Sequence, residues 1–310
     1  MDAVRQIAQA VLYEGYLLWP YRRSALKNQH RFTIGGLYPA RYAQSFGDRS
    51  EARVECLIEG TQPELDLEVR FLHMIRRQVC VDGSAVDDVT LDGRRYLTWD
   101  ETVERSAGEA DRLTWEAGSE RERVSTNLEL LRSWERIDGL VECHVARLDD
   151  ALQRISIRVA NESLATDSSR DAALRCTMLA CHVVLHVRDG TFVSTVDPPA
   201  TLAKAAQACR SEGLWPVLVG TPPARDTILA SPIILEEYPQ IAAETPCDFF
   251  DGAEIGELLA QSILALSDEE KQEMRATDPR ARQILERVES MTPIELARLH
   301  GGLRPRESVT

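Results

Sequence analysis

The sequence predicts an α+β protein: an antiparallel β-rich body, either a sandwich or an open barrel, with an N-terminal helix and a helical C-terminal segment. Apolar residues recur at helical spacing in residues 2–18, apolar and polar residues alternate over much of 32–161, and helix-capping sequences follow residue 253. We expect the β-rich body at 31–197, a mixed region at 198–252, helices at 253–301 and a disordered tail at 302–310.

Residues 1–30 combine a helix with a basic aromatic corner. Val4, Ile7 and Val11 share one helical face, and Pro20 ends the pattern. Arginine and aromatic side chains favour protein interfaces, so we predict that the corner, residues 19–31, is partly exposed and binds a protein. Alternatively, its rings fill the core and its arginines are solvated or pair internally. The candidate partner-binding residues are Trp19, Tyr21, Arg22, Arg23, Lys27 and Arg31.

The β-rich body is predicted from period-two alternation. In 65–81, Leu65, Leu67 and Val69 share one face while charged residues occupy the other. Further strands are expected at 53–59, 94–104, 120–130, 140–148 and 153–159, with a tight connection at 148–151. The charged stretch 101–122 suits a solvated hairpin or a mobile loop. Many strands at short spacing favour a sandwich or barrel.

The next part of the body is predicted as a hairpin. Leu174 to Val187 reads as one long apolar strand, Asp189-Gly190 as the turn, and 191–196 as the returning strand. A short helix is expected at 200–210. We call residues 213–251 the seam: its apolar runs 215–219 and 228–235 read as buried strands joined by a Pro-rich turn.

Helix-capping sequences mark the C-terminal region. Ser267 with Glu270 forms a capping box, Asp278-Pro279 places proline at the first helical position, and Thr292 with Glu295 repeats the capping box. A further apolar helical pattern covers 253–264. The 236–290 stretch is acidic, which suits either a solvated helical face or an acidic docking surface.

Charge, hydropathy and cysteine content argue against several classes of protein. The net charge of −14 argues against a nucleic-acid surface, which needs basic residues. The N-terminus lacks a signal-peptide pattern, and no apolar run reaches the ~18 residues of a membrane span. Seven scattered cysteines favour reduced thiols. We therefore expect a cytoplasmic protein without a transmembrane segment.

Few residues suggest chemistry. The densest metal-like group is Cys176, Cys181, His182 and His186. On a strand, Cys176 and Cys181 point to opposite faces and the group binds no ion; on a helix, His182 and His186 become neighbours and a site is feasible. Glu236 and Glu237 follow a buried strand of the seam, where active-site loops often lie. No recognised catalytic motif is present, so we predict no catalytic, cofactor-binding or metal residue.

Two segments resemble a known family. They are LYEGYLLWPYRRSALKN at 12–28 and the run from LWPVLVG to CDFFDGAEI at 214–255. They are similar to accessory proteins encoded in the gene clusters of actinobacterial-type, high-affinity uptake nickel–iron hydrogenases. The family's motifs have no assigned chemistry. The resemblance implies a role in assembling, maturing or attaching such a hydrogenase, with a hydrogenase subunit or a maturation factor as the partner.

Three hypotheses about function follow. The first is a non-catalytic cytoplasmic accessory or assembly protein that binds a protein partner. The second is an enzyme of unrecognised family with a site near the seam, which a deep pocket lined by Glu236, Glu237 and a histidine would favour. The third is a metal or iron–sulfur protein that uses Cys176, Cys181, His182 and His186.

Overall fold

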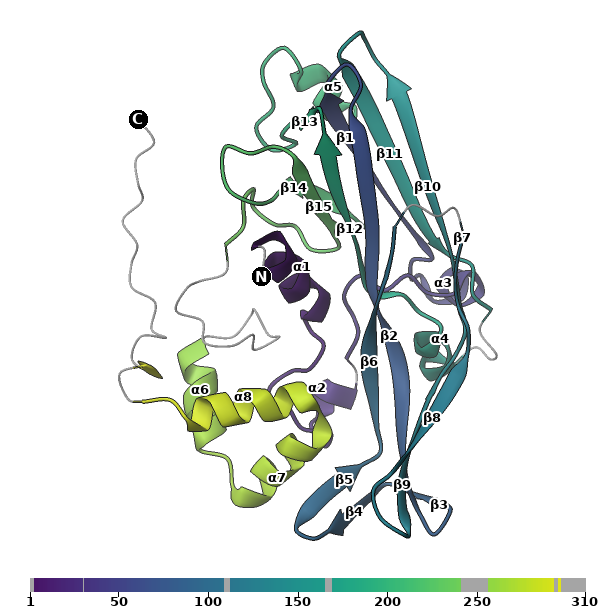
Figure 1. Ribbon diagram of the computed structural model, residues 1–310, viewed down its shortest axis with the longest axis vertical. Coiled ribbons are helices and arrows are strands. Elements are labelled where there is room, and N and C mark those ends of the chain that lie inside the picture. The colour runs from purple at the N-terminus through teal and green to yellow at the C-terminus, as the bar shows by residue number, and fades with distance from the viewer. Residues whose placement is uncertain are drawn as a thin grey trace. The chain divides into compact units, whose positions relative to one another are not determined.

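The fold is known from a computed structural model, which describes residues 3–29, 31–108, 112–164, 169–240, 256–292 and 295–296 (Figure 1). The chain divides into two compact units. The first comprises Met1–Tyr13, Phe32–Asp87 and Thr98–Gln240, and the second comprises Glu14–Arg31, Asp88–Leu97 and Ile241–Thr310. The tail expected at 302–310 lies outside the described residues.

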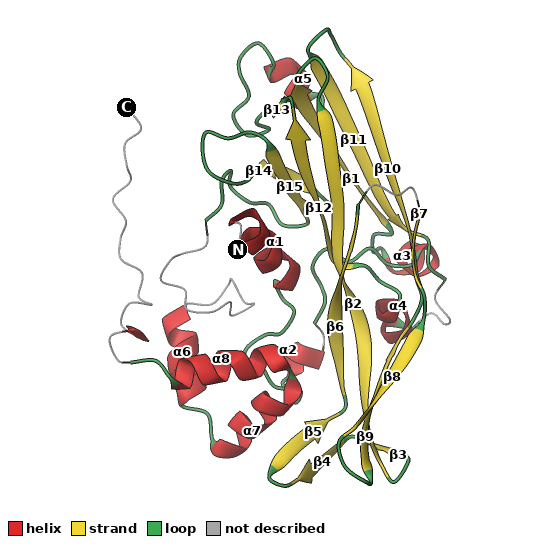
Figure 2. Ribbon diagram, in the orientation of Figure 1, coloured by secondary structure: helices red, strands yellow, loops and turns green. Residues whose placement is uncertain are grey.

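The first unit contains two antiparallel sheets (Figure 2). The five-stranded sheet has the order β13 (Thr191–Phe192), β1 (Glu51–Glu59), β11 (Leu152–Asn161), β10 (Ile137–Arg147) and β7 (Arg112–Trp115). The longer sheet has the order β14 (Trp215–Leu218), β15 (Thr227–Ser231), β12 (Leu179–Arg188), β2 (Glu64–Val81), β9 (Leu128–Trp134) and β8 (Gly118–Arg123). Two more strands, β3 (Ser84–Val86) and β6 (Trp99–Ala107), also pair with β2.

The two sheets enclose one apolar core. Alternate residues of β1 and β11 in one sheet, and of β2 and β12 in the other, belong to a single buried cluster, which includes Val54, Cys56, Ile58, Ile155, Ile157, Val159, Leu67, Val69, Phe71, Cys181, Val183 and Leu185. This is a sandwich, not a closed barrel. The prediction of an antiparallel β-rich body with an N-terminal helix and a helical C-terminal segment is confirmed.

Helix α1 (Ala3–Tyr13) covers the outer face of the longer sheet. Ile7, Ala8 and Val11 pack with Val217, Val219 and Leu229, and Val184 of β12 borders the same cluster. Because β12 and β15 are buried on both faces, their sequences are nearly continuous apolar runs without alternation. The helix ends before Gly15, whose φ of +70° suits the left-handed turn after a helix, so it is shorter than predicted.

The hairpin predicted across 174–196 is wrong in two respects. The run that begins at Leu174 is not one strand: α4 (Arg170–Arg175) comes first, with Ser169 accepting a hydrogen bond from the Ala172 amide, and β12 begins only at Leu179. The segment after Asp189-Gly190 does not pair with β12, because β13 pairs with β1 instead. A short apolar run at a helix end cannot be told from a strand by periodicity.

Three short helices complete the connections. Helix α5 (Ala203–Gln207) lies inside the predicted 200–210 range. Helices α2 (Leu26–Gln29) and α3 (Ala40–Phe46) were not predicted. The expected connection at 148–151 joins β10 to β11, and the Asp149 carboxylate accepts hydrogen bonds from the Ala151 and Leu152 amides.

The second unit contains a hairpin and helices. The hairpin strands are β4 (Asp88–Leu91) and β5 (Arg94–Leu97), so the strand predicted at 94–104 is broken into β5 and β6. The described helices of this unit are α2 and also α6 (Gly256–Leu264), α7 (Asp268–Thr277) and α8 (Pro279–Glu289). Helix α7 packs against both β5 and α8.

The predicted caps are present in this unit. The Ser267–Glu270 capping box is formed, and the Asp278 side chain accepts a hydrogen bond from the Arg280 amide at the start of α8. Thr292 and Glu295 exchange equivalent bonds. Within the described residues, no helix is both long and apolar enough to cross a membrane.

Candidate functional site

The corner at 19–31 lies in the second unit, and part of it is buried. Tyr21 is fully buried, with the half-buried Trp19 edge-on to it at 6.0 Å between ring centroids. The Arg31 side chain is also buried, and its Nη1 donates to the Tyr16 carbonyl over 3.3 Å. Arg22 pairs with Glu270 of α7 at 3.0 Å. These four candidates therefore contribute to the structure of the unit.

Polar contacts hold the corner in place. The buried Asn28 amide donates to the carbonyls of Leu18 and Arg22 and accepts from the Leu18 amide, which closes the loop between them. The Arg23 backbone amide donates to the Thr277 hydroxyl, and Ser24 donates through its amide and its hydroxyl to the carboxylate of Glu273.

A buried phenol lies beneath the corner. The Tyr16 hydroxyl donates to the Asp278 carboxylate over 2.6 Å, and the guanidinium groups of Arg31 and Arg280 lie over its ring at 5.3 and 5.6 Å. Burial, and next the negative charge of Asp278, raise the pKa of Tyr16 well above its usual value. The phenol therefore keeps its proton and donates a hydrogen bond to the carboxylate of Asp278, the residue that caps α8.

The exposed part of the corner is smaller than the predicted surface. Leu26 on α2 is 71% exposed, and Lys27 beside it is exposed as well. Arg23 is partly exposed. Binding of a partner by the corner stays a prediction, and the surface available for it centres on these residues.

The four residues of the proposed metal group do not converge. Cys176 follows α4 and is not on the strand as expected, whereas Cys181 faces the sandwich core and His182 and His186 alternate with it along β12. Burial raises the pKa of Cys181 to about 12 and lowers that of His182 to about 4. In the part of the chain that the structure describes, no three His, Cys, Asp or Glu side chains are grouped as a metal site.

The two glutamates of the seam, Glu236 and Glu237, do not line either of the pockets described below. Glu236 is exposed, and one carboxylate oxygen of Glu237 is buried and has no hydrogen-bond partner within the described part of the chain. Tyr238 follows with a φ of +51°, its amide donating to the Leu218 carbonyl of β14. The seam residues 241–251 lie outside the described residues.

A small polar pocket of about 160 Å³ lies between α1 and the outer face of the longer sheet. Its polar lining comes from both elements: Arg5 from α1, and Glu68, Arg70, His186 and Thr227 from the sheet. His186 Nδ1 lies 3.2 Å from the Thr227 hydroxyl, which donates to the Asp226 carboxylate over 2.9 Å. Next to it, Glu104 accepts from Gln9, Tyr13 and Arg70. These polar groups are largely bonded to one another.

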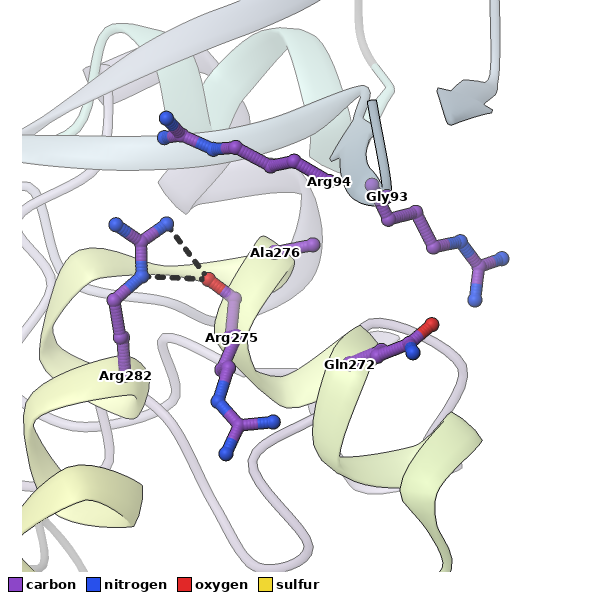
Figure 3. A pocket seen from close by; sticks show the side chains of 7 residues that line it. Gly93, Arg94, Gln272, Arg275, Ala276 and Arg282 are labelled. Atoms are coloured by element: carbon purple, nitrogen blue, oxygen red, sulfur yellow. Dashed lines mark hydrogen bonds between the residues drawn. The ribbon is translucent and has the colours of Figure 1, made fainter. Parts of the chain in front are cut away.

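A larger pocket, of about 270 Å³, lies within the second unit (Figure 3). We call it the arginine pocket; it is lined by Gly93, Arg94, Arg95, Gln272, Arg275, Ala276 and Arg282. The Asp92-Gly93 turn, with φ of +51° and +76°, places two consecutive arginines at the start of β5. Helices α7 and α8 supply the other side chains.

The arginines of this pocket differ in how their charges are balanced. Arg95 pairs with Asp88 at 2.6 Å, and Arg275 pairs with Glu289 at 2.7 Å. Arg282 donates from Nε and Nη2 to the Arg275 carbonyl at 3.2 and 3.0 Å, while the Arg275 side chain extends away from it (Figure 3). Arg94 lies over the Tyr96 ring at 5.0 Å. Among the described residues, no carboxylate pairs with Arg94 or Arg282.

Sequence reasoning missed this pocket. The Asp92-Gly93 turn signal was visible beside Arg94 and Arg95, but nothing local indicates that Arg275 and Arg282 meet them. Comparison with known proteins adds no identification: no family model matches the chain, and no curated protein matches it significantly.

Proposed function

We propose that this protein is a non-catalytic cytoplasmic accessory protein that binds a protein partner through the exposed part of the corner. The observation that supports this best is Leu26, a large apolar side chain 71% exposed beside the cationic Lys27. Helix α2, which presents them, is held in place by its buried Asn28, so little order has to be gained on binding.

The proposed partner surface is acidic with an apolar depression. Such a surface would receive Leu26 and pair with the basic side chains beside it. The resemblance of 12–28 and 214–255 to the uptake-hydrogenase accessory family suggests a hydrogenase subunit or a maturation factor. Among the described residues, Cys56, Cys80, Cys176, Cys181 and Cys209 form no disulfide, which supports a reducing compartment.

The test is co-purification from the native host with the Leu26→Glu, Lys27→Glu double variant. We expect loss of the partner, identified by mass spectrometry, and the melting temperature, measured in parallel, establishes that the variant is folded. Arg22 is unsuitable for this test, since its replacement by glutamate would place two carboxylates together at Glu270.

Val196→Glu is the matched control, because Val196 is another exposed apolar residue, at 66%, in the first unit. It should retain the partner. Normal co-purification with the double variant would refute docking through the corner, and so would loss of the partner with both variants.

A further inference from the structure

We propose that the arginine pocket binds a small phosphate-bearing anion. The described lining residues all belong to the second unit, and binding of an anion there does not depend on the docking of a protein at the corner.

The charge of the pocket is the first support. Four arginines line it, and none of its described lining residues is acidic. Asp88 and Glu289 balance Arg95 and Arg275, which leaves the charges of Arg94 and Arg282 without a carboxylate partner among the described residues. Guanidinium groups stay protonated in proteins, so about two positive charges remain for a ligand. In a chain of net charge −14, this is a local reversal of sign.

The donor geometry is the second support. Arg282 uses Nε and Nη2 on the Arg275 carbonyl, which fixes the guanidinium plane and leaves Nη1 for a ligand. Arg94 is exposed and lines the pocket from the hairpin, and its guanidinium group lies on the same side of the pocket as that of Arg282 (Figure 3). A guanidinium group held in place before binding loses less entropy when it bonds an oxyanion.

The charge favours phosphate over a single carboxylate. A phosphate monoester carries about −1.5 to −2 at neutral pH and presents three acceptor oxygens, which matches the charge and the donors of two unbalanced guanidinium groups. The volume of about 270 Å³ suits a compact ligand, because pockets that enclose drug-sized molecules span about 300–1,000 Å³. We therefore expect a small phosphorylated metabolite or phosphate itself.

The test uses the full-length protein and inorganic phosphate at constant ionic strength, measured by isothermal titration calorimetry and by thermal shift. We expect saturable binding at one site and a rise in melting temperature. Arg94→Gln and Arg282→Gln should each weaken binding by roughly tenfold or more, since each removes a charged hydrogen bond. Arg121→Gln, which alters an exposed arginine of β8 in the first unit, is the control and should bind phosphate as the parent protein does.

Several outcomes would overturn the proposal. The site is refuted if phosphate does not bind saturably, or if it binds equally well to the Arg94→Gln variant. Because Arg94 lies on the exposed hairpin, this variant remains informative if Arg282→Gln does not fold. Citrate, titrated in parallel, distinguishes carboxylate chemistry. If citrate binds the pocket more tightly than phosphate, the assignment of a phosphate-bearing ligand is wrong.

Discussion

At the scale of single residues, His182 shows how burial determines charge. Its side chain is fully buried on β12, Nδ1 lies 3.2 Å from the Ala180 carbonyl, and Nε2 has no hydrogen-bond partner among the residues that the structure describes. Burial, opposed by the Ala180 carbonyl and reinforced by the nearby Arg70, lowers the pKa of His182 to about 4. The folded protein therefore holds a neutral imidazole at pH values where an unfolded chain, with a histidine pKa near 6.5, is already protonated.

This difference predicts a pH-dependent stability. Between about pH 6.5 and pH 4 the unfolded chain binds a proton that the folded chain does not, so His182 makes the free energy of unfolding fall as pH falls. His182→Met removes that contribution. Urea titrations measure how far the free energy of unfolding falls between pH 7 and pH 4. This fall should be smaller in the variant than in the parent protein, by up to about 3 kcal/mol.

The exposed His144 provides the control for that comparison, since His144→Met makes the same substitution outside the core. An unchanged pH slope in His182→Met would contradict the prediction.

Single residues also mark the limit of sequence reasoning about the site. The composition of the corner was visible, but nothing in it indicated that Tyr21 and Arg31 are buried in the folded protein. The Arg23 amide bonds a hydroxyl 254 positions later in the chain, and the arginine pocket combines a hairpin with two distant helices. Contacts of this kind leave no local pattern.

At the scale of elements, the strand edges of the sandwich are protected unequally. The edge strand β8 carries four consecutive exposed charges, Glu120 to Arg123, which discourage pairing with another chain. In β10, β7 covers only Ile137 to Leu140. Among the described strands, none pairs with the rest of that side, where Val145 is 56% exposed.

The hydrogen-bond alternation along β10 yields a prediction. The bonds Glu162 N–Asp138 O and Leu148 N–Leu152 O show that even-numbered residues of β10 face β11, so the Ala146 amide is bonded and the Val145 amide points outward. Proline lacks the amide hydrogen. Ala146→Pro should therefore cost at least about 1 kcal/mol more than Val145→Pro in chemical denaturation.

The two substitutions are neighbours on one exposed strand, so each serves as the control for the other. Equal losses of stability, or a larger loss for Val145→Pro, would show that this side of β10 is paired in solution.

Elements were also where the sequence was most informative. In strands with one solvent-facing side, such as β1 and β11, apolar and polar residues alternate, and these strands were predicted from that alternation. The capping box of Ser267 and Glu270 likewise predicted α7, and the Asp278-Pro279 pair predicted α8. The predictions failed at 174–196, because apolar residues buried on both faces have no period and because a turn signal does not specify which strand the chain pairs with next.

At the scale of the whole molecule, each unit has a core of its own. Leu185 on β12 is fully buried in the sandwich core, and Leu285 on α8 is fully buried in the second unit. A leucine-to-alanine change at a buried site costs about 2–5 kcal/mol. We therefore expect two calorimetric transitions, with Leu185→Ala lowering the melting temperature of one and Leu285→Ala lowering that of the other.

The shifts should also differ in size. The second unit contains fewer than half as many residues as the first, and the entropy of unfolding scales with the number of residues. An equal energetic loss should therefore lower the melting temperature of the second unit about twice as far. Phosphate provides an independent assignment, because a ligand of the arginine pocket should raise only the transition that Leu285→Ala lowers. A single transition that both variants lower equally would show instead that the two cores unfold as one.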